Sequence, residues 1–279
     1  MSLNNDYNCD TEFVKLMARQ TDVDLTTAAL ELSRDVTPNL DFRETFSWID
    51  DRANEISGCV ACSKTERDAL QELGRCIAER QGIYGEKDCY ERPQSSYLDR
   101  VIETKRGIPI ALSLLYMAVG DRIGIELKGV AAPAHFLVRY ESVEGPLFLD
   151  PFFRGRIFTF SECSQWLRNL TGLPDQAIES ALQPVGPRKI IIRILNNLKT
   201  VYGNQKNWAA ARTVQHRLAT LEPASYRQRK DLAVISLKAN RPGEAIDLLQ
   251  SCLRSCANDE KQTLESLLDQ AHNQVVRWN

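Results

Sequence analysis

An almost uniformly apolar stretch constrains the fold of this chain more than any other feature. The segment from Arg106 to Ile125 reads RGIPIALSLLYMAVGDRIGI, and between Ile108 and Ile123 it is interrupted only by Ser113, Gly120, Asp121 and Arg122. A helix that is apolar nearly all round is buried on several sides, whereas a surface helix is apolar along one stripe. Pro109 predicts the helix start, because proline fits the first helical turn. We therefore expect the other elements to pack around this helix.

Length and charge define the class of protein. The chain has 279 residues and a net charge of −2, with 43% hydrophobic and 26% charged residues. This length predicts two domains of unequal size. Without a basic stripe or an apolar run of about 18 residues, the sequence predicts neither a nucleic-acid nor a membrane partner. The N-terminus lacks a signal pattern, so we expect a cytoplasmic protein. No cofactor is indicated.

Eight cysteines are too few for a disulfide scaffold in a chain of this length. Cys59 and Cys62 have the spacing of a redox or zinc motif, and Cys76 and Cys89 follow. Neither a second such pair nor a histidine pair lies at metal-ligand spacing. We therefore expect loop and core thiols and no metal site.

Hydrophobic periodicity predicts an α+β protein. Apolar stripes at helical spacing mark residues 11–35, Phe42–Ile56 and Lys64–Gln81, and a short helix is expected at Tyr97–Lys105. After Gly124 the period changes. Short segments rich in β-branched and aromatic residues then predict a small antiparallel sheet, with strands at Leu127–Ala132, His135–Tyr140, Leu147–Asp150 and Arg156–Phe160.

His135 and Asp150 form the best candidate for a chemical site. If residues 141–144 make a four-residue hairpin loop, Tyr140 faces Gly145 and the antiparallel count places His135 opposite Asp150. A carboxylate beside an imidazole fixes its tautomer, as in the last two members of a Cys-His-Asp triad. The alternative is a structural histidine held in a hairpin.

Three motifs resemble a known family. The runs GIYGEKDCYERPQSSYLDRVIETKRGIPIALSLLY, AAPAHFLVRY and FLDPFFRG are similar to the transglutaminase-like core of bacterial SirB-type proteins, which carry C-terminal tetratricopeptide-like repeats. The resemblance implies a papain/transglutaminase-like fold. In that fold a central helix packs on an antiparallel sheet, and the histidine and aspartate face the N-terminus of the helix.

The chain departs from this family at the nucleophile. The resemblance implies a cysteine at the start of the central helix, about fifteen residues before the glycine that ends it. Counting back from Gly124 reaches Pro109, and no residue from Arg106 to Ala111 is Cys, Ser or Thr. We therefore expect a non-catalytic protein. The alternative is an amide hydrolase or acyl-transferase in which His135 and Asp150 act on Cys89 or on a water. Ser113 is the nearest hydroxyl, but it lies one turn inside the helix, where we expect it to be buried.

Polar residues at the start of the central helix predict a binding groove. Tyr97, Glu103, Arg106 and Pro109 come towards this end with the histidine and aspartate, and such a groove would take a peptide segment or a small ligand. The structural alternative pairs Glu103 with Arg106 and holds the histidine with the aspartate.

The C-terminal part carries an internal repeat. After the joint Gln183–Pro187, Ala211 and Ala245 lie 34 residues apart in similar contexts. We expect a core at 1–184 and a tetratricopeptide-like domain at 185–279, with units at about 192–225 and 226–259 and a capping helix at 260–278. Such repeats bind peptides in a concave groove, so a protein or peptide partner is predicted. His216 and His272 are expected to be surface or packing residues.

Overall fold

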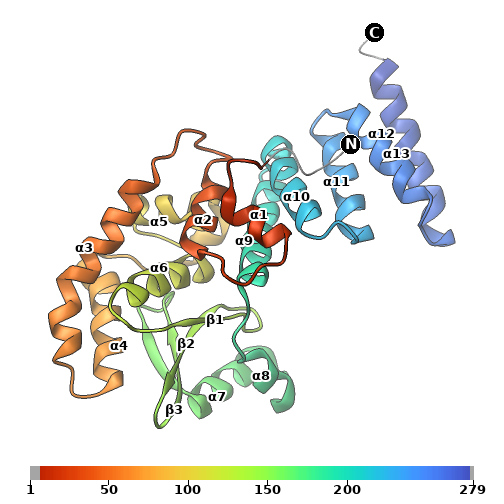
Figure 1. Ribbon diagram of the computed structural model, residues 1–279. Coiled ribbons are helices and arrows are strands. Elements are labelled where there is room, and N and C mark those ends of the chain that lie inside the picture. Colours follow the sequence, from red (N-terminus) through yellow and green to blue (C-terminus); the bar gives the residue numbers. More distant parts are fainter. Residues whose placement is uncertain (1–6, 277–279) are drawn as a thin grey trace. The chain divides into compact units, whose positions relative to one another are not determined.

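The computed structural model describes residues 7–276 and divides into two compact units (Figure 1). One unit is Cys9–Ile194, and the other runs from Leu195 onward and includes Tyr7 and Asn8. The division lies ten residues beyond the predicted domain limit at 184, inside helix α9 (Pro187–Asn204).

Helices make up the first part of the first unit. Polar side chains cap three of them: Asp24, Asp41 and Thr65 accept hydrogen bonds from the first-turn amides of α2, α3 and α4. A π-helical turn continues α4, and two 3₁₀ turns precede α5. The elements are α1 (Thr11–Met17), α2 (Leu25–Ser33), α3 (Phe42–Ala61), α4 (Glu66–Gly74), η2 (Arg75–Arg80), η3 (Lys87–Glu91), η4 (Pro93–Ser96) and α5 (Leu98–Thr104).

The apolar stretch forms the central helix, as predicted. Helix α6 spans Pro109–Arg122 and starts with proline in its first turn. Nearly all of its side chains are buried, because α2, α3, α4 and α5 pack around it together with strands β1 (Lys128–Val130) and β2 (Leu137–Ser142).

Four antiparallel strands form one sheet in the order β1-β2-β3-β4, where β3 is Gly145–Asp150 and β4 is Arg156–Thr159. Alternate residues of each strand face opposite sides. On one side, Leu137 and Phe148 join a core with residues of α7 (Phe160–Thr171) and α8 (Asp175–Ala181). On the other side lie Val138 and Leu149, and α6 contacts β1 and β2. The sheet therefore lies between α6 and the α7–α8 layer (Figure 1).

The hairpin register differs from the prediction. Ser142 pairs with Gly145 and Tyr140 with Leu147, so the β2–β3 loop has two residues instead of four. The shift is two residues along the strand, and an even shift keeps every side chain on its predicted face. His135, which precedes β2, therefore still reaches Asp150 at the end of β3, although the two are not directly opposite.

Helices α10 (Trp208–Leu221), α11 (Tyr226–Lys238), α12 (Pro242–Leu253) and α13 (Asn258–Val276) follow α9 in the second unit, and successive helices from α10 onward pack together. The repeated alanines, Ala211 and Ala245, are fully buried. His216 packs inside this unit, with its Nδ1 2.7 Å from the hydroxyl of Tyr7, and His272 is exposed.

Candidate functional site

A buried histidine–aspartate pair lies where β2 begins and β3 ends. The Nε2 atom of His135 is 2.9 Å from each carboxylate oxygen of Asp150. An ionised carboxylate only accepts hydrogen bonds, so Nε2 carries the proton that it donates. In the neutral imidazole this leaves a lone pair on Nδ1. The pair thus fixes the tautomer of the ring, as predicted from the hairpin.

The Asp150 carboxylate also organises the turn that follows it. Oδ1 accepts hydrogen bonds from the backbone amides of Phe152, at 3.1 Å, and Phe153, at 3.2 Å. The side chain is fully buried. A buried carboxylate needs such donors to offset the loss of hydration. Asp150 therefore holds both the imidazole and the β3–β4 turn.

Aromatic rings enclose the imidazole of His135, whose residue exposure is 6%. Phe153 stacks against it with ring centroids 6.0 Å apart and an interplanar angle of 23°. Phe152 and Trp166 of α7 meet it edge-on, at 5.9 and 5.3 Å. These rings restrict the access of a substrate to the histidine.

An arginine of α9 holds the backbone at His135. Arg193 of α9 donates from Nη2 to the carbonyl oxygens of His135, at 2.6 Å, and Ala132, at 3.2 Å. The preceding residue, Ala134, has a left-handed φ of +57°, a conformation that costs a non-glycine residue free energy. Burial lowers the pKa of Arg193. This tight turn, with the arginine across it, fixes where β2 starts.

None of the three positions considered for a nucleophile is equipped as one. Pro109 is the first residue of α6. Ser113 is buried on the same helix, and its Oγ has no hydrogen-bond partner among the described residues. Cys89 is buried too, and its Sγ accepts a hydrogen bond from the Glu86 amide at 3.4 Å. Within residues 7–276, no hydrogen bond joins this thiol to His135.

Three residues of the groove predicted at the start of α6 make contacts within the chain. The guanidinium of Arg106 donates to Glu86 Oε1 at 2.8 Å and to the Tyr84 hydroxyl at 2.7 Å. Glu103 pairs with Arg100 at 2.6 Å, so the expected pair between Glu103 and Arg106 is wrong. Tyr97 is buried directly before α5. Arg106 thus ties the segment before η3 to the start of α6.

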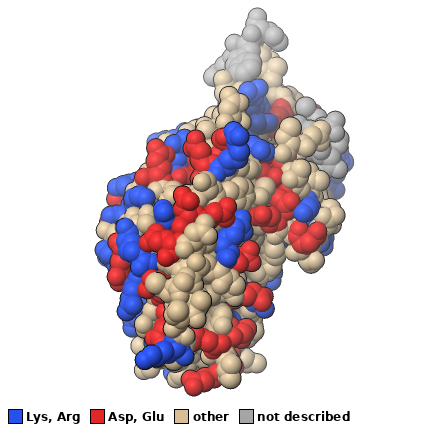
Figure 2. Space-filling model, turned by 60° about the vertical axis from the view of Figure 1, so that its left-hand side comes forward, with Lys and Arg blue, Asp and Glu red and all other residues tan. Residues whose placement is uncertain are grey.

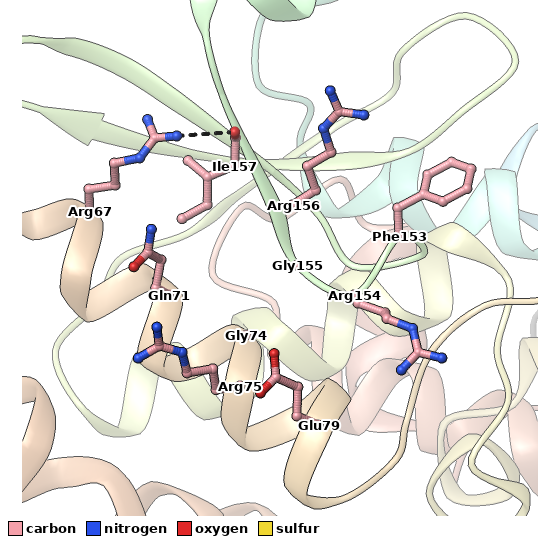
Figure 3. A pocket seen from close by; sticks show the side chains of 10 residues that line it. All are labelled: Arg67, Gln71, Gly74, Arg75, Glu79, Phe153, Arg154, Gly155, Arg156 and Ile157. Atoms are coloured by element: carbon pink, nitrogen blue, oxygen red, sulfur yellow. Dashed lines mark hydrogen bonds between the residues drawn. The ribbon is translucent and has the colours of Figure 1, made fainter.

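Sequence reasoning missed a pocket that is lined by α4, η2, the β3–β4 turn and the start of β4 (Figure 3). It has a volume of about 290 Å³, and four arginines line it: Arg67, Arg75, Arg154 and Arg156. We call it the arginine pocket. Two signals in the sequence point to it. Arg67, Gln71, Arg75 and Glu79 recur every four residues, which is the spacing of one helix face, and Arg154 and Arg156 flank Gly155.

The cysteine pair of the sequence motif lies on the last turn of α3 and next to it. Cys59 and Cys62 are both exposed. In the described part of the chain, no group of three or more His, Cys, Asp or Glu side chains is placed to hold a metal ion. Nor does any described helix combine the length and apolar character that crossing a bilayer requires.

Comparison with known proteins identifies the family. The model of the transglutaminase-like superfamily matches residues 43–196. A UPF0162 protein of Xylella fastidiosa (strain 9a5c) is 32% identical over 228 residues, which cover 80% of this chain and 81% of that protein. Protein SirB1 of Salmonella typhimurium is 21% identical over 85% of this chain and 90% of its own length.

A smaller region is shared with a eukaryotic protein. F-box only protein 21 of Mus musculus is 28% identical over 156 residues, which are 53% of this chain and 24% of that protein. No solved structure matches the chain. The family model covers α3 to the first part of α9, the region that contains the central helix, the sheet and the His135–Asp150 pair. The chain therefore belongs to the transglutaminase-like superfamily, and within it to the SirB type.

Proposed function

We propose that this protein is a non-catalytic member of its superfamily that acts by binding another protein. The observation that carries the proposal is Pro109 at the first position of α6. Proline has no side-chain nucleophile, so the amides at this helix start have no thiol to activate. Ser113 and Cys89 are buried and do not replace it.

The enclosure of the imidazole supports the same proposal. An acyl-transfer site must bring a substrate carbonyl to within about 3 Å of both the nucleophile and its base. Here Phe152, Phe153 and Trp166 contact the ring of His135. In this proposal the pair with Asp150 stabilises the fold and has no substrate.

Thiol mapping tests the catalytic half of the proposal. The native protein and a His135→Ala variant are treated with an alkylating agent near neutral pH, and the modified cysteines are mapped by mass spectrometry. We expect fast labelling of the exposed Cys9, Cys59 and Cys62 and slow labelling of Cys89 in both proteins. Rapid labelling of Cys89 that disappears in the variant would overturn the proposal and identify its nucleophile.

Two other buried thiols serve as internal controls. Burial raises the pKa of Cys76. Burial, with a smaller contribution from the charge of Asp150, raises the pKa of Cys163 to about 12. Because thiolate is the reactive form, both should label slowly unless the unit opens. If His135→Ala accelerates them together with Cys89, the variant has loosened the fold, and the measurement is made with His135→Gln.

A water-dependent amide hydrolase is the second candidate, and the tautomer of His135 favours it. With Nε2 donating to Asp150, the lone pair on Nδ1 is placed to accept a proton from a water. Release of amine from a library of peptide amides, compared between the native protein and His135→Gln, distinguishes the two candidates. Our proposal expects equal background rates, and turnover that depends on His135 would favour the hydrolase.

We assign partner binding to the helical unit. Its packed helices support a tetratricopeptide-like arrangement, with the repeated Ala211 and Ala245 buried. A cavity of about 640 Å³ lies beside Arg241, between the α11–α12 connection and α13. A photoreactive amino acid at Arg241, which is exposed, should crosslink one protein partner. The same group at exposed Glu265 of α13 is the control, and equal crosslinking from both sites would contradict this assignment.

A further inference from the structure

The arginine pocket gathers four basic residues on a chain whose net charge is −2, whereas basic and acidic side chains are interspersed on the face shown in Figure 2. Four arginines line it, with their guanidinium groups spread around it in Figure 3, against one lining acidic residue, Glu79. Like charges that line one pocket repel each other, and a bound counter-charge relieves this repulsion. The cluster therefore points to an anionic ligand.

Few acidic side chains neutralise these arginines. Arg75 lies 3.9 Å from Glu72, which is at the limit of an ion pair. For Arg67, Arg154 and Arg156, no ion pair within 4 Å is formed among residues 7–276. Arg67 donates to the Ile157 carbonyl at 3.4 Å, a long hydrogen bond. Most of the hydrogen-bonding capacity of the four groups thus remains for a ligand or water.

The charges of Arg67 and Arg156 also act on Glu162 of α7, but this carboxylate is engaged elsewhere. It accepts hydrogen bonds from the backbone amide of Thr159 at 2.7 Å and from its hydroxyl at 3.0 Å, in the capping box of α7. These hydrogen bonds lower the pKa of Glu162. The charges of Arg67 and Arg156 lower it further, by a smaller amount.

Two of the arginines are held in place by aromatic rings. The guanidinium carbon of Arg154 lies 3.7 Å from the ring centroid of Tyr84, and that of Arg156 lies 4.5 Å from the ring centroid of Phe158. Stacking of this kind leaves the N–H groups at the edge of the guanidinium plane available. It also reduces the conformational entropy that a ligand would cost on binding.

The floor of the pocket is bare backbone. Gly74 and Gly155 lie between the two arginine-bearing segments in Figure 3. A Cβ on Gly155 would come within 3.0 Å of Gly74 Cα and of the Tyr116 hydroxyl, and its φ is +75°. Both facts require glycine at this position. Glycine thus lets the β3–β4 turn pack closely on Gly74, and this packing brings the two arginine-bearing segments together.

The backbone on both sides departs from regular structure. The segment that carries Arg75 and Glu79 is π-helical, and π-helical turns are frequent at functional sites. On the facing turn, Arg154 has a φ of +58°, a conformation that costs a non-glycine residue about 1 kcal/mol or more. A backbone conformation of this free-energy cost is often retained at functional sites, where it positions a side chain.

We propose that the arginine pocket binds the phosphate group of a small phosphorylated molecule. The volume of about 290 Å³ lies at the lower end of the range of roughly 300–1,000 Å³ for small-molecule sites, so it suits a compact ligand. Guanidinium groups bind phosphate through paired hydrogen bonds. A phosphate presents more oxygens than a carboxylate does, so it can accept hydrogen bonds from more than one guanidinium group.

Isothermal titration calorimetry of the full chain at low salt tests this proposal, with inorganic pyrophosphate as the probe. We expect saturable binding that weakens as salt increases. Arg156→Gln and Arg67→Gln should each weaken binding about tenfold, since each removes a charge-assisted contact. Arg19→Gln, the same change at an exposed arginine outside the pocket, should leave binding unchanged. All three sites are exposed, and thermal melting of each variant checks the fold.

Other probes separate phosphate from competing ligands. A sugar phosphate should bind through the same arginines. Malonate, a dianion of carboxylates, should bind at least about tenfold more weakly than pyrophosphate, and equal affinity would overturn the assignment to phosphate. A phosphoserine peptide that binds much more tightly than both phosphates would overturn the small-molecule class. No binding of any phosphate at millimolar concentration, or equal binding by the Gln variants, would overturn the site.

Discussion

The His135–Asp150 pair and the arginine pocket meet at the β3–β4 turn, and they differ in burial and in the balance of their charges. The pair is buried, and its carboxylate is fully engaged with an imidazole and two backbone amides. The arginines of the pocket are exposed, and their charges are only partly balanced. Phe153 belongs to both, because it stacks on the imidazole and lines the pocket. Buried polar groups stabilise this fold where the chain supplies their partners, whereas exposed and partly balanced charges remain open to a ligand or to water.

Replacing Asp150 should have the largest effect. Asp150→Ala leaves two backbone amides and the histidine without their acceptor, so we expect the free energy of unfolding to fall by about 3 kcal/mol or more. Urea denaturation followed by circular dichroism measures it.

Asp175→Ala is the matched control for this substitution, because that carboxylate is 65% exposed and pairs with Arg168 on the surface. It should change stability by less than about 0.5 kcal/mol. If the two substitutions cost the same, the buried pair does not stabilise the fold, and the contrast between the two regions fails.

Removing the shared ring should have an intermediate effect. Phe153 is 56% exposed, so Phe153→Ala should cost at most about 1 kcal/mol, but it uncovers one face of the His135 imidazole. Modification of that ring by diethyl pyrocarbonate should then accelerate several-fold, as measured by mass spectrometry. His272 is exposed and serves as the internal control, whose rate should not change. An unchanged rate at His135 would mean that Phe152 and Trp166 alone enclose it.

Much of this arrangement was predictable, and the reasons differ between elements. Helix α6 could be found because its apolar residues continue around the whole circumference, and only a buried helix has that pattern. The meeting of His135 and Asp150 could be found despite a wrong loop length, because side chains alternate along a strand and an even register shift preserves their face.

The partners of charged side chains could not be predicted in the same way. Arg106 pairs with Glu86, twenty residues away, and not with its near neighbour Glu103. A long charged side chain can pair with any of several partners at a similar free energy, so closeness in the sequence is a weak guide to which ion pair forms. The arginine pocket is assembled from α4, η2 and the β3–β4 turn, and the close approach of Gly74 and Gly155 that joins them depends on tertiary packing.

Substitution of Arg154 should have the smallest effect on stability, and it tests most directly whether the pocket exists for a ligand. Arg154→Gly relieves the left-handed backbone, worth about 1 kcal/mol, but it adds about 0.5–1 kcal/mol of unfolded-state entropy and removes the stacking on Tyr84. These contributions nearly cancel, so we expect a net change within about 0.5 kcal/mol by urea denaturation, together with weaker pyrophosphate binding.

Arg19 provides a matched control for this last substitution, since it is an exposed arginine with the same φ of +58° outside the pocket. Arg19→Gly should change stability as little as Arg154→Gly does and leave pyrophosphate binding intact. If Arg154→Gly instead costs more than about 1.5 kcal/mol, a loss well beyond that of an ordinary surface substitution, the arginine is retained for the fold. The two sides of the turn would then be alike. If Arg154→Gly keeps its stability and no longer binds pyrophosphate, the two regions have separate roles. The His135–Asp150 pair then stabilises the fold, whereas Arg154 carries a charge that the fold does not need.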